Sequence, residues 1–381
     1  MLTPFPLSRN SQPGTGGPSR QLYMLLREVP NRAEAMAYLQ RRLAEAAALH
    51  PAWSGGLAGL EEWHELRART QAEEFRLYLA GRSEGGTRRH FATLAQARRF
   101  LCMQAPLLLA EGAWLHSVLD HWRQPAYMPL VKLYLDYLGK GVPAANHVAQ
   151  VQHALSAQSC SNWQELEDGS YVQAAIRLAL ACAGERYLPE LLGYQLAVPD
   201  QPASQFSVLH ELGELGIVLP PPLPDGLVLT ALRTMLGNVT DRPAFLQRLE
   251  VGHALGRLGL QTVPATASEG AQYEEATSKV TPAVFAPPAN GATHADAATE
   301  VDVEDVGGSA PRGILRHDFP RDEHAWEIIS SDLGLLEAQI AACASKAQAM
   351  TMLARHMGPA VHHQPLGLMA ARVYSQLFAL G

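Results

Sequence analysis

The spacing of apolar residues constrains this chain most strongly. In the stretch AEAMAYLQRRLAEAAALHPAW, the apolar residues Met36, Leu39 and Leu43 lie three or four positions apart, which is the repeat of an α-helix that buries one face. Helical patterns recur over 21–80, 94–122, 127–157, 169–184 and 187–217. No segment alternates apolar and polar residues with the period of two that is typical of strands. The sequence therefore predicts an all-α fold.

Composition divides the chain into four parts. Residues 1–20 are rich in Pro, Gly and Ser, and we expect a mobile tail there. Residues 21–261 carry the main helical bundle. Residues 262–313 are dominated by Ala, Thr, Pro, Gly and acidic residues without periodicity, so they bury too little apolar surface to offset the entropy of ordering. We expect a disordered linker or insertion there, followed by C-terminal helices over 314–381 that pack on the bundle.

Charge and cysteine usage exclude several classes of protein. The formal net charge is −7, so the basic excess that marks nucleic-acid binding is missing. No apolar run reaches the length of a membrane span, and the N-terminus does not resemble a signal peptide. The four cysteines are scattered without a CxxC pair, which is typical of reduced thiols. We expect a cytoplasmic protein that binds neither nucleic acid nor membrane.

Three side chains in apolar helical surroundings are candidates for chemistry. Glu111 would share a helix face with Leu115, and a carboxylate there needs an ion-pair partner, hydrogen bonds or a metal. It could equally use the dipole of a helix that restarts at Pro106. His147 would lie in the first turns of the helix that follows a Gly-Lys-Gly turn, either packed or acting as a ligand. Glu190 falls in a first helical turn, where a negative charge is favourable in itself.

Several stretches occur in an order that suggests a known family. They are AEGAWLHSVLDHW at 110–122, PLVKLYLDYLGKGVPAANHVAQVQHAL at 129–155, YVQAAIRLALACAGERYLPELLGYQLA at 171–197, LHELGELGI at 209–217, DRPAFLQRLEVGHALGRLGL at 241–260 and KAQAMTMLARHMGPAVHHQPLGL at 346–368. In this combination the chain resembles the heme-oxygenase-like diiron oxidases, a family of iron-containing redox enzymes. The resemblance implies a heme-oxygenase-like helical bundle, here with a long disordered insertion near the C-terminus. It also implies two irons that are held by carboxylates and histidines and activate dioxygen.

The ligand set that this resemblance implies is incomplete. Glu111 matches the family's first glutamate, and His147 matches the histidine of the second motif. Tyr137 stands where a glutamate is implied ten residues before that histidine, and Pro199 stands where a later glutamate is implied. The His-x-x-x-Asp of the family's last helix is missing, and Asp225 in a Pro-rich turn is the nearest substitute. Glu111 and His147 are the retained positions.

Three hypotheses about function remain open. The first is a non-catalytic family member that binds iron weakly or not at all and serves as a partner or scaffold, beside an active homologue or as a homodimer. The second is an O₂-dependent non-heme oxidase or oxygenase of a small molecule, with one Fe(II) held by Glu111, His147 and either Asp225 or Glu190. The third is a metal-free protein that binds a small molecule in a cavity lined by Tyr137, Glu190 and Asp225.

Overall fold

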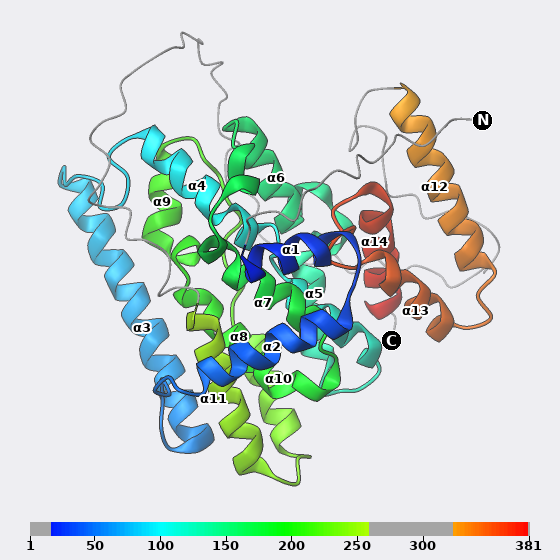
Figure 1. Ribbon diagram of the computed structural model, residues 1–381, viewed down its shortest axis with the longest axis horizontal. Helices are drawn as coiled ribbons and strands as arrows, with labels where there is room; N and C mark the ends of the chain where they lie inside the picture. Colours follow the sequence, from blue (N-terminus) through cyan, green and yellow to red (C-terminus); the bar gives the residue numbers. More distant parts are fainter. Residues whose placement is uncertain (1–16, 259–322, 380–381) are drawn as a thin grey trace, which may run out of the picture. The chain divides into compact units, whose positions relative to one another are not determined.

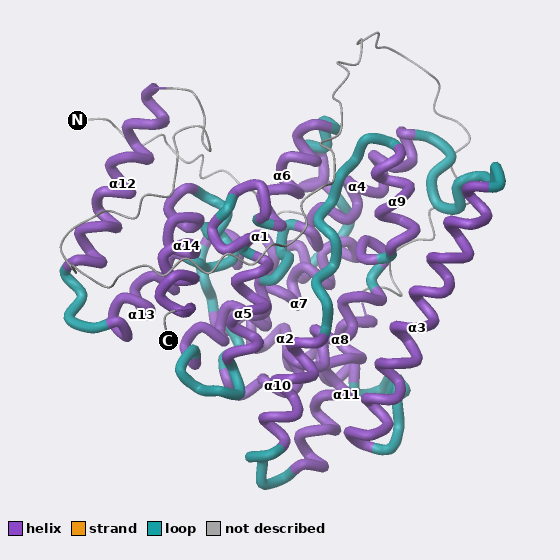
Figure 2. The backbone as a smooth tube through the Cα atoms, turned by 180° about the vertical axis from the view of Figure 1, so that it is seen from behind, coloured by secondary structure: helices purple, strands orange, loops and turns teal. Residues whose placement is uncertain are grey.

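The computed structural model describes residues 17–258 and 323–379 (Figure 1). Every regular element within these ranges is helical, and they contain no strand (Figure 2), which confirms the all-α prediction. None of the described helices combines the length and the apolar character needed to cross a membrane. The linker expected at 262–313 lies outside the described residues.

The helices follow one another along two described segments. The first segment contains α1 (Pro18–Glu28), α2 (Arg32–Ala46), α3 (Gly56–Ser83), α4 (Leu94–Leu108), the 3₁₀ helix η1 (Ala113–His121), α5 (Met128–Tyr137), α6 (His147–Ala157), α7 (Val172–Ala181), α8 (Leu188–Ala197), α9 (Phe206–Glu214), α10 (Gly226–Leu236) and α11 (Arg242–Leu258). The second contains α12 (Glu323–Ala341), α13 (Lys346–His356) and α14 (Pro365–Ala379). Short 3₁₀ turns occupy Gly139–Gly141, Pro143–Ala145, Asn162–Glu165, Asp168–Tyr171, Glu185–Tyr187, Val198–Asp200 and Pro202–Ser204.

Helices α7 and α8 lie in the interior. Every residue of α8 is buried, and so are the residues of α7 up to Leu180, as is typical of helices that are covered on all sides. Helices α1 and α2 pack on α7 together with η1, and α11 packs along α8. Polar side chains on α7 and α8 therefore face other protein groups and need partners among them.

Glycines allow α8 and α11 to approach closely. A Cβ atom on Gly193 would lie 1.9 Å from the carbonyl oxygen of Leu249, and one on Gly252 would lie 2.1 Å from that of Glu190. A Cβ atom on Gly256 would likewise meet the Ala197 side chain at 2.5 Å. Residue 190 lies against residue 252, and residue 197 lies against residue 256. The two helices therefore run in the same direction, with backbone against backbone.

Two predicted boundaries were wrong. The helix expected over 94–122 ends at Leu108, after passing through Pro106 without restarting. Gly112 then takes a left-handed conformation (φ 75°), and a Cβ atom there would lie 2.8 Å from that of Tyr137. Glu111 therefore lies in a turn, beyond the end of a helix, and not on a regular helical face. The range 1–20, which was expected to be a mobile tail, includes the start of α1 at Pro18, a residue suited to a first helical turn. Residues 1–16 lie outside the described part of the chain.

Candidate functional site

A buried arginine on α7, Arg177, lies at the centre of the polar interior. Its side chain is 1% exposed and forms an ion pair with Glu111 through Nη1. The same nitrogen donates to the carbonyl oxygen of Leu107 at 2.9 Å. Nη2 donates to Oε1 of Gln201 at 2.5 Å, and Nε donates to the hydroxyl oxygen of Tyr194 at 3.1 Å. All three guanidinium nitrogens therefore have acceptors.

The polar network extends from Arg177 to Tyr137. The guanidinium carbon of Arg177 lies 4.5 Å from the ring centroid of Trp114, within the range of a cation–π interaction. Trp114 Nε1 donates to Oε1 of Gln195 at 2.9 Å. The amide nitrogen of Gln195 lies 3.4 Å from the Tyr137 hydroxyl oxygen. The phenol that stands where a glutamate was implied is thus part of the same network as the arginine.

Three of the predicted site residues come together. Gly112, the residue after Glu111, lies against Tyr137, whose ring meets the ring of His147 edge to face at a centroid distance of 5.1 Å. Burial lowers the pKa of His147, while the charge of Glu111 acts in the opposite direction. Burial and, to a smaller extent, the charge of Glu111 raise the pKa of Tyr137 well above its usual value. Both rings are therefore neutral at neutral pH.

These residues do not fit a dimetal centre. Burial works to lower the pKa of Arg177, but the Glu111 carboxylate and Tyr194 outweigh it, and the pKa lies above its usual value. Glu111 is consequently paired with a permanent positive charge, which would repel a metal ion at the same place. Among the described residues, no three His, Cys, Asp or Glu side chains form a group that could hold a metal.

Glu190 has a separate, structural role. It lies in the first turn of α8, as predicted. Both of its carboxylate oxygens accept hydrogen bonds of 2.7 Å from Arg248 on α11, one from Nε and one from Nη2. Such a two-point guanidinium–carboxylate pair fixes the relative position of two helices. Glu190 does not line the cavity described next.

Asp225 lines a cavity of about 550 Å³. The walls come from α3, from 199–207, from 222–226 and from the loop after α3. The Asp225 side chain is 4% exposed, and its Oδ2 accepts a hydrogen bond of 2.7 Å from Arg67 Nη2. His64 Nε2 lies 3.4 Å from the same oxygen. The other oxygen, Oδ1, is buried and has no hydrogen-bond partner in the described part of the chain. Pro199 lines this cavity too, whereas Tyr137 does not.

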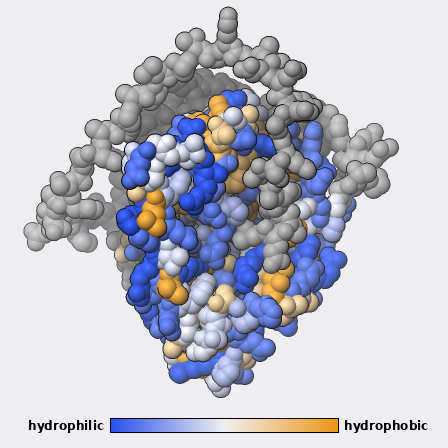
Figure 3. Space-filling view, turned by 90° about the vertical axis from the view of Figure 1, so that its left-hand side faces the viewer, coloured by the Kyte–Doolittle hydropathy of each residue, from blue (hydrophilic) through white to orange (hydrophobic). Residues whose placement is uncertain are grey.

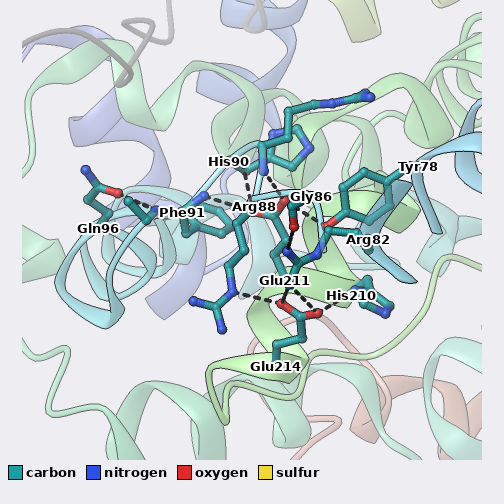
Figure 4. Close-up of polar contacts among 12 residues, drawn as sticks. Tyr78, Arg82, Gly86, Arg88, His90, Phe91, Gln96, His210, Glu211 and Glu214 are labelled. Carbon is teal, nitrogen blue, oxygen red and sulfur yellow. Dashed lines mark hydrogen bonds and ion pairs between the residues drawn. The ribbon is translucent and has the colours of Figure 1, made fainter. Parts of the chain in front are cut away.

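A buried carboxylate on α9 holds one wall of the cavity in place (Figure 4). Glu211 accepts hydrogen bonds from the backbone N–H groups of Arg89 (2.5 Å), His90 (2.8 Å) and Phe91 (2.9 Å), and from the Tyr78 hydroxyl at 2.8 Å. Burial works to raise the pKa of Glu211, but these donors outweigh it, and the pKa lies below its usual value. Arg89 and His90, which line the cavity, are therefore anchored to α9 through an ionised group.

Reasoning from the sequence missed two features of the site, the buried arginine on α7 and the cavity, although the arginine could have been recognised. An arginine within VQAAIRLALA is a charge on an otherwise apolar helix, and such a charge requires a buried partner. The cavity had no comparable signal, because its walls come from segments far apart in the sequence.

Comparisons with known proteins give no match: no family model fits the chain, and neither a curated protein nor a solved structure matches it.

Proposed function

We propose that this chain is a metal-free protein that binds a small molecule, built on a heme-oxygenase-like helical bundle. The ion pair between Arg177 and Glu111 supports the first half of this proposal, that the protein binds no metal. A carboxylate in the interior is stable only with a compensating charge or hydrogen bonds. In a diiron protein the metal would supply that charge. Here the guanidinium supplies it, so Glu111 contributes to the stability of the core.

The cavity supports binding of a small molecule. Its volume, about 550 Å³, lies within the roughly 300–1,000 Å³ of typical small-molecule sites. Its lining mixes apolar residues, such as Phe75, Phe206 and Leu223, with many polar and charged ones. One of the charged residues is Asp225, whose Oδ1 has no hydrogen-bond partner among the described residues. The face drawn in Figure 3 is mostly hydrophilic, and its hydrophobic residues form small separate areas. A larger apolar patch, which is typical of protein docking, is not visible on the coloured part of that face.

Anaerobic loading with Fe(II), followed by desalting and elemental analysis, tests the metal-free part. We expect far less than one iron per chain, and the same result for Glu111→Gln and His147→Gln. Iron near two per chain in the wild type, lost in both variants, would overturn the proposal in favour of an O₂-dependent iron oxidase. The matched control is Glu61→Gln, which removes a surface carboxylate that pairs with Arg233.

A further inference from the structure

We propose that the cavity beside Asp225 binds an organic ammonium ion, that is, a protonated primary amine with an apolar body. This inference names the ligand class of the proposed function and rests on it. It begins from Asp225 Oδ1, a buried carboxylate oxygen that accepts no hydrogen bond from the described residues. Leaving a buried charged acceptor unsatisfied is costly. An ammonium group carries three N–H donors and forms charge-assisted hydrogen bonds with carboxylates.

The charges around the cavity favour a cation. The cavity lining contains three carboxylates and two guanidinium groups, those of Glu74, Asp200, Asp225, Arg67 and Arg89. Arg67 is already engaged, because Nη2 pairs with Asp225 and Nη1 lies 3.6 Å from Asp200 Oδ2. Arg89 lies over the ring of Tyr78 at 5.5 Å. Since Nε of Arg67 lacks an acceptor in the described part of the chain, an anion is the competing ligand, and the test includes one.

Aromatic side chains at the cavity suit the apolar body of such a ligand. Phe75 on α3 and Phe206 at the start of α9 both line the cavity, with ring centroids 5.5 Å apart. Phe206 is 46% exposed, so its ring is accessible to a ligand. Aromatic faces attract cations and pack against apolar groups. Burial lowers the pKa of His90, so this ring adds no positive charge to the wall at neutral pH.

Three probes of nearly equal size test the ligand class on the wild-type chain. They are 3-phenylpropylammonium, the alcohol 3-phenylpropan-1-ol and the anion 3-phenylpropanoate, each titrated by isothermal calorimetry. We expect the ammonium to bind at least about tenfold more tightly than either of the others, the ratio typical of one hydrogen bond to a charged group. Equal or tighter binding of the alcohol or the anion would overturn the proposal, and so would the absence of binding by all three.

Two variants locate the site. Asp225→Asn keeps the shape and removes the charge, so it should weaken the ammonium about tenfold and leave the alcohol nearly unchanged. Phe206→Ala alters an exposed rim position and should weaken the ammonium and the alcohol alike. Asp136→Asn is the control, because Asp136 pairs with Lys140 at the surface, and it should bind as the wild type does. Full ammonium affinity in Asp225→Asn would overturn the proposal.

Two controls distinguish a loss of ammonium binding from a loss of folding and from a failure of the proposed function. Asp225→Asn also loses an ion pair with Arg67, so circular dichroism accompanies each titration. If this variant does not fold, Phe206→Ala decides together with the three probes: unchanged ammonium affinity in Phe206→Ala would then overturn the proposal. Stoichiometric iron together with preserved, Asp225-dependent ammonium binding would overturn only the metal-free part of the proposed function.

Discussion

The interior of this protein depends on how single charged residues find partners. Removing a guanidinium from water costs several kcal/mol, and that cost is offset only when acceptors surround it. Arg177 meets this condition, with acceptors on all three nitrogens and an aromatic ring against its plane. Glu111 depends on Arg177 in turn, because the guanidinium is the charged group that pairs with this carboxylate in the turn between α4 and η1.

Replacing Arg177 with Met should therefore destabilise the protein strongly. The variant leaves the Glu111 carboxylate without its partner, and we expect the free energy of unfolding in urea to fall by about 3–5 kcal/mol. The double variant Arg177→Met/Glu111→Gln should recover part of the loss, because no unpaired charge remains. As a control, Arg233→Met breaks an exposed pair with Glu61 and should cost less than about 1 kcal/mol. Equal losses in Arg177→Met and Arg233→Met would contradict this view of the core.

The lowered pKa of Glu211 predicts how the free energy of unfolding depends on pH. Its pKa is lowered in the folded state, so its carboxylate stabilises the fold fully above the unfolded value of about 4.3 and progressively less as the pH falls through the folded pKa. We expect Glu211→Gln to be about 2–3 kcal/mol less stable than the wild type at pH 7. That difference should shrink in urea unfolding curves recorded below about pH 4. A difference that stays constant from pH 7 to pH 3 would show that ionisation of Glu211 is unimportant.

At the scale of elements, the sequence predicted helices better than it predicted their ends and neighbours. Periodicity was sufficient for the all-α class, and the Gly-Lys-Gly break before His147 occurs where expected. The end of α4 was missed because Gly112 turns the chain where it meets Tyr137, a contact between distant residues. The parallel pairing of α8 with α11 was also not predictable, since it depends on which glycines face another backbone.

Alanine should have opposite effects at a glycine in the α8–α11 contact and at an exposed glycine on α12. Gly193→Ala would place a methyl group against the Leu249 carbonyl oxygen, and overpacking of this kind costs about 2–3 kcal/mol. Gly334→Ala lies on α12, where no described atom is within 4 Å of the added carbon. There alanine should stabilise the helix by about 0.5–1 kcal/mol. Thermal unfolding followed by circular dichroism measures both, and a stabilising Gly193→Ala would refute the close approach of these helices.

At the scale of the whole molecule, the candidate site consists of two regions, and the sequence predicted the composition of one better than that of the other. Family resemblance selected Glu111, Tyr137 and His147, and the structure brings these three residues together. The metal-ligand role implied for Glu111 stays a prediction, and the partner of this carboxylate in the structure is Arg177. Asp225 was named both as a substitute ligand and as a cavity-lining residue, and it lines the cavity described above. Its neighbours Arg67 and Phe206 come from α3 and α9, and no local pattern connects those helices to the Pro-rich turn before α10.

If the core needs no metal and the cavity takes an ammonium ion, global stability should respond to amines and not to chelators. Incubation with EDTA or 1,10-phenanthroline should leave the Tm unchanged, since no folding energy comes from metal binding. Adding 3-phenylpropylammonium at a hundred times its Kd should stabilise the folded state by about 2.7 kcal/mol through mass action. Differential scanning calorimetry measures both effects, with Asp225→Asn as the variant in which the amine shift should be much smaller. A Tm that falls with the chelator would instead identify a metal as part of the folded core.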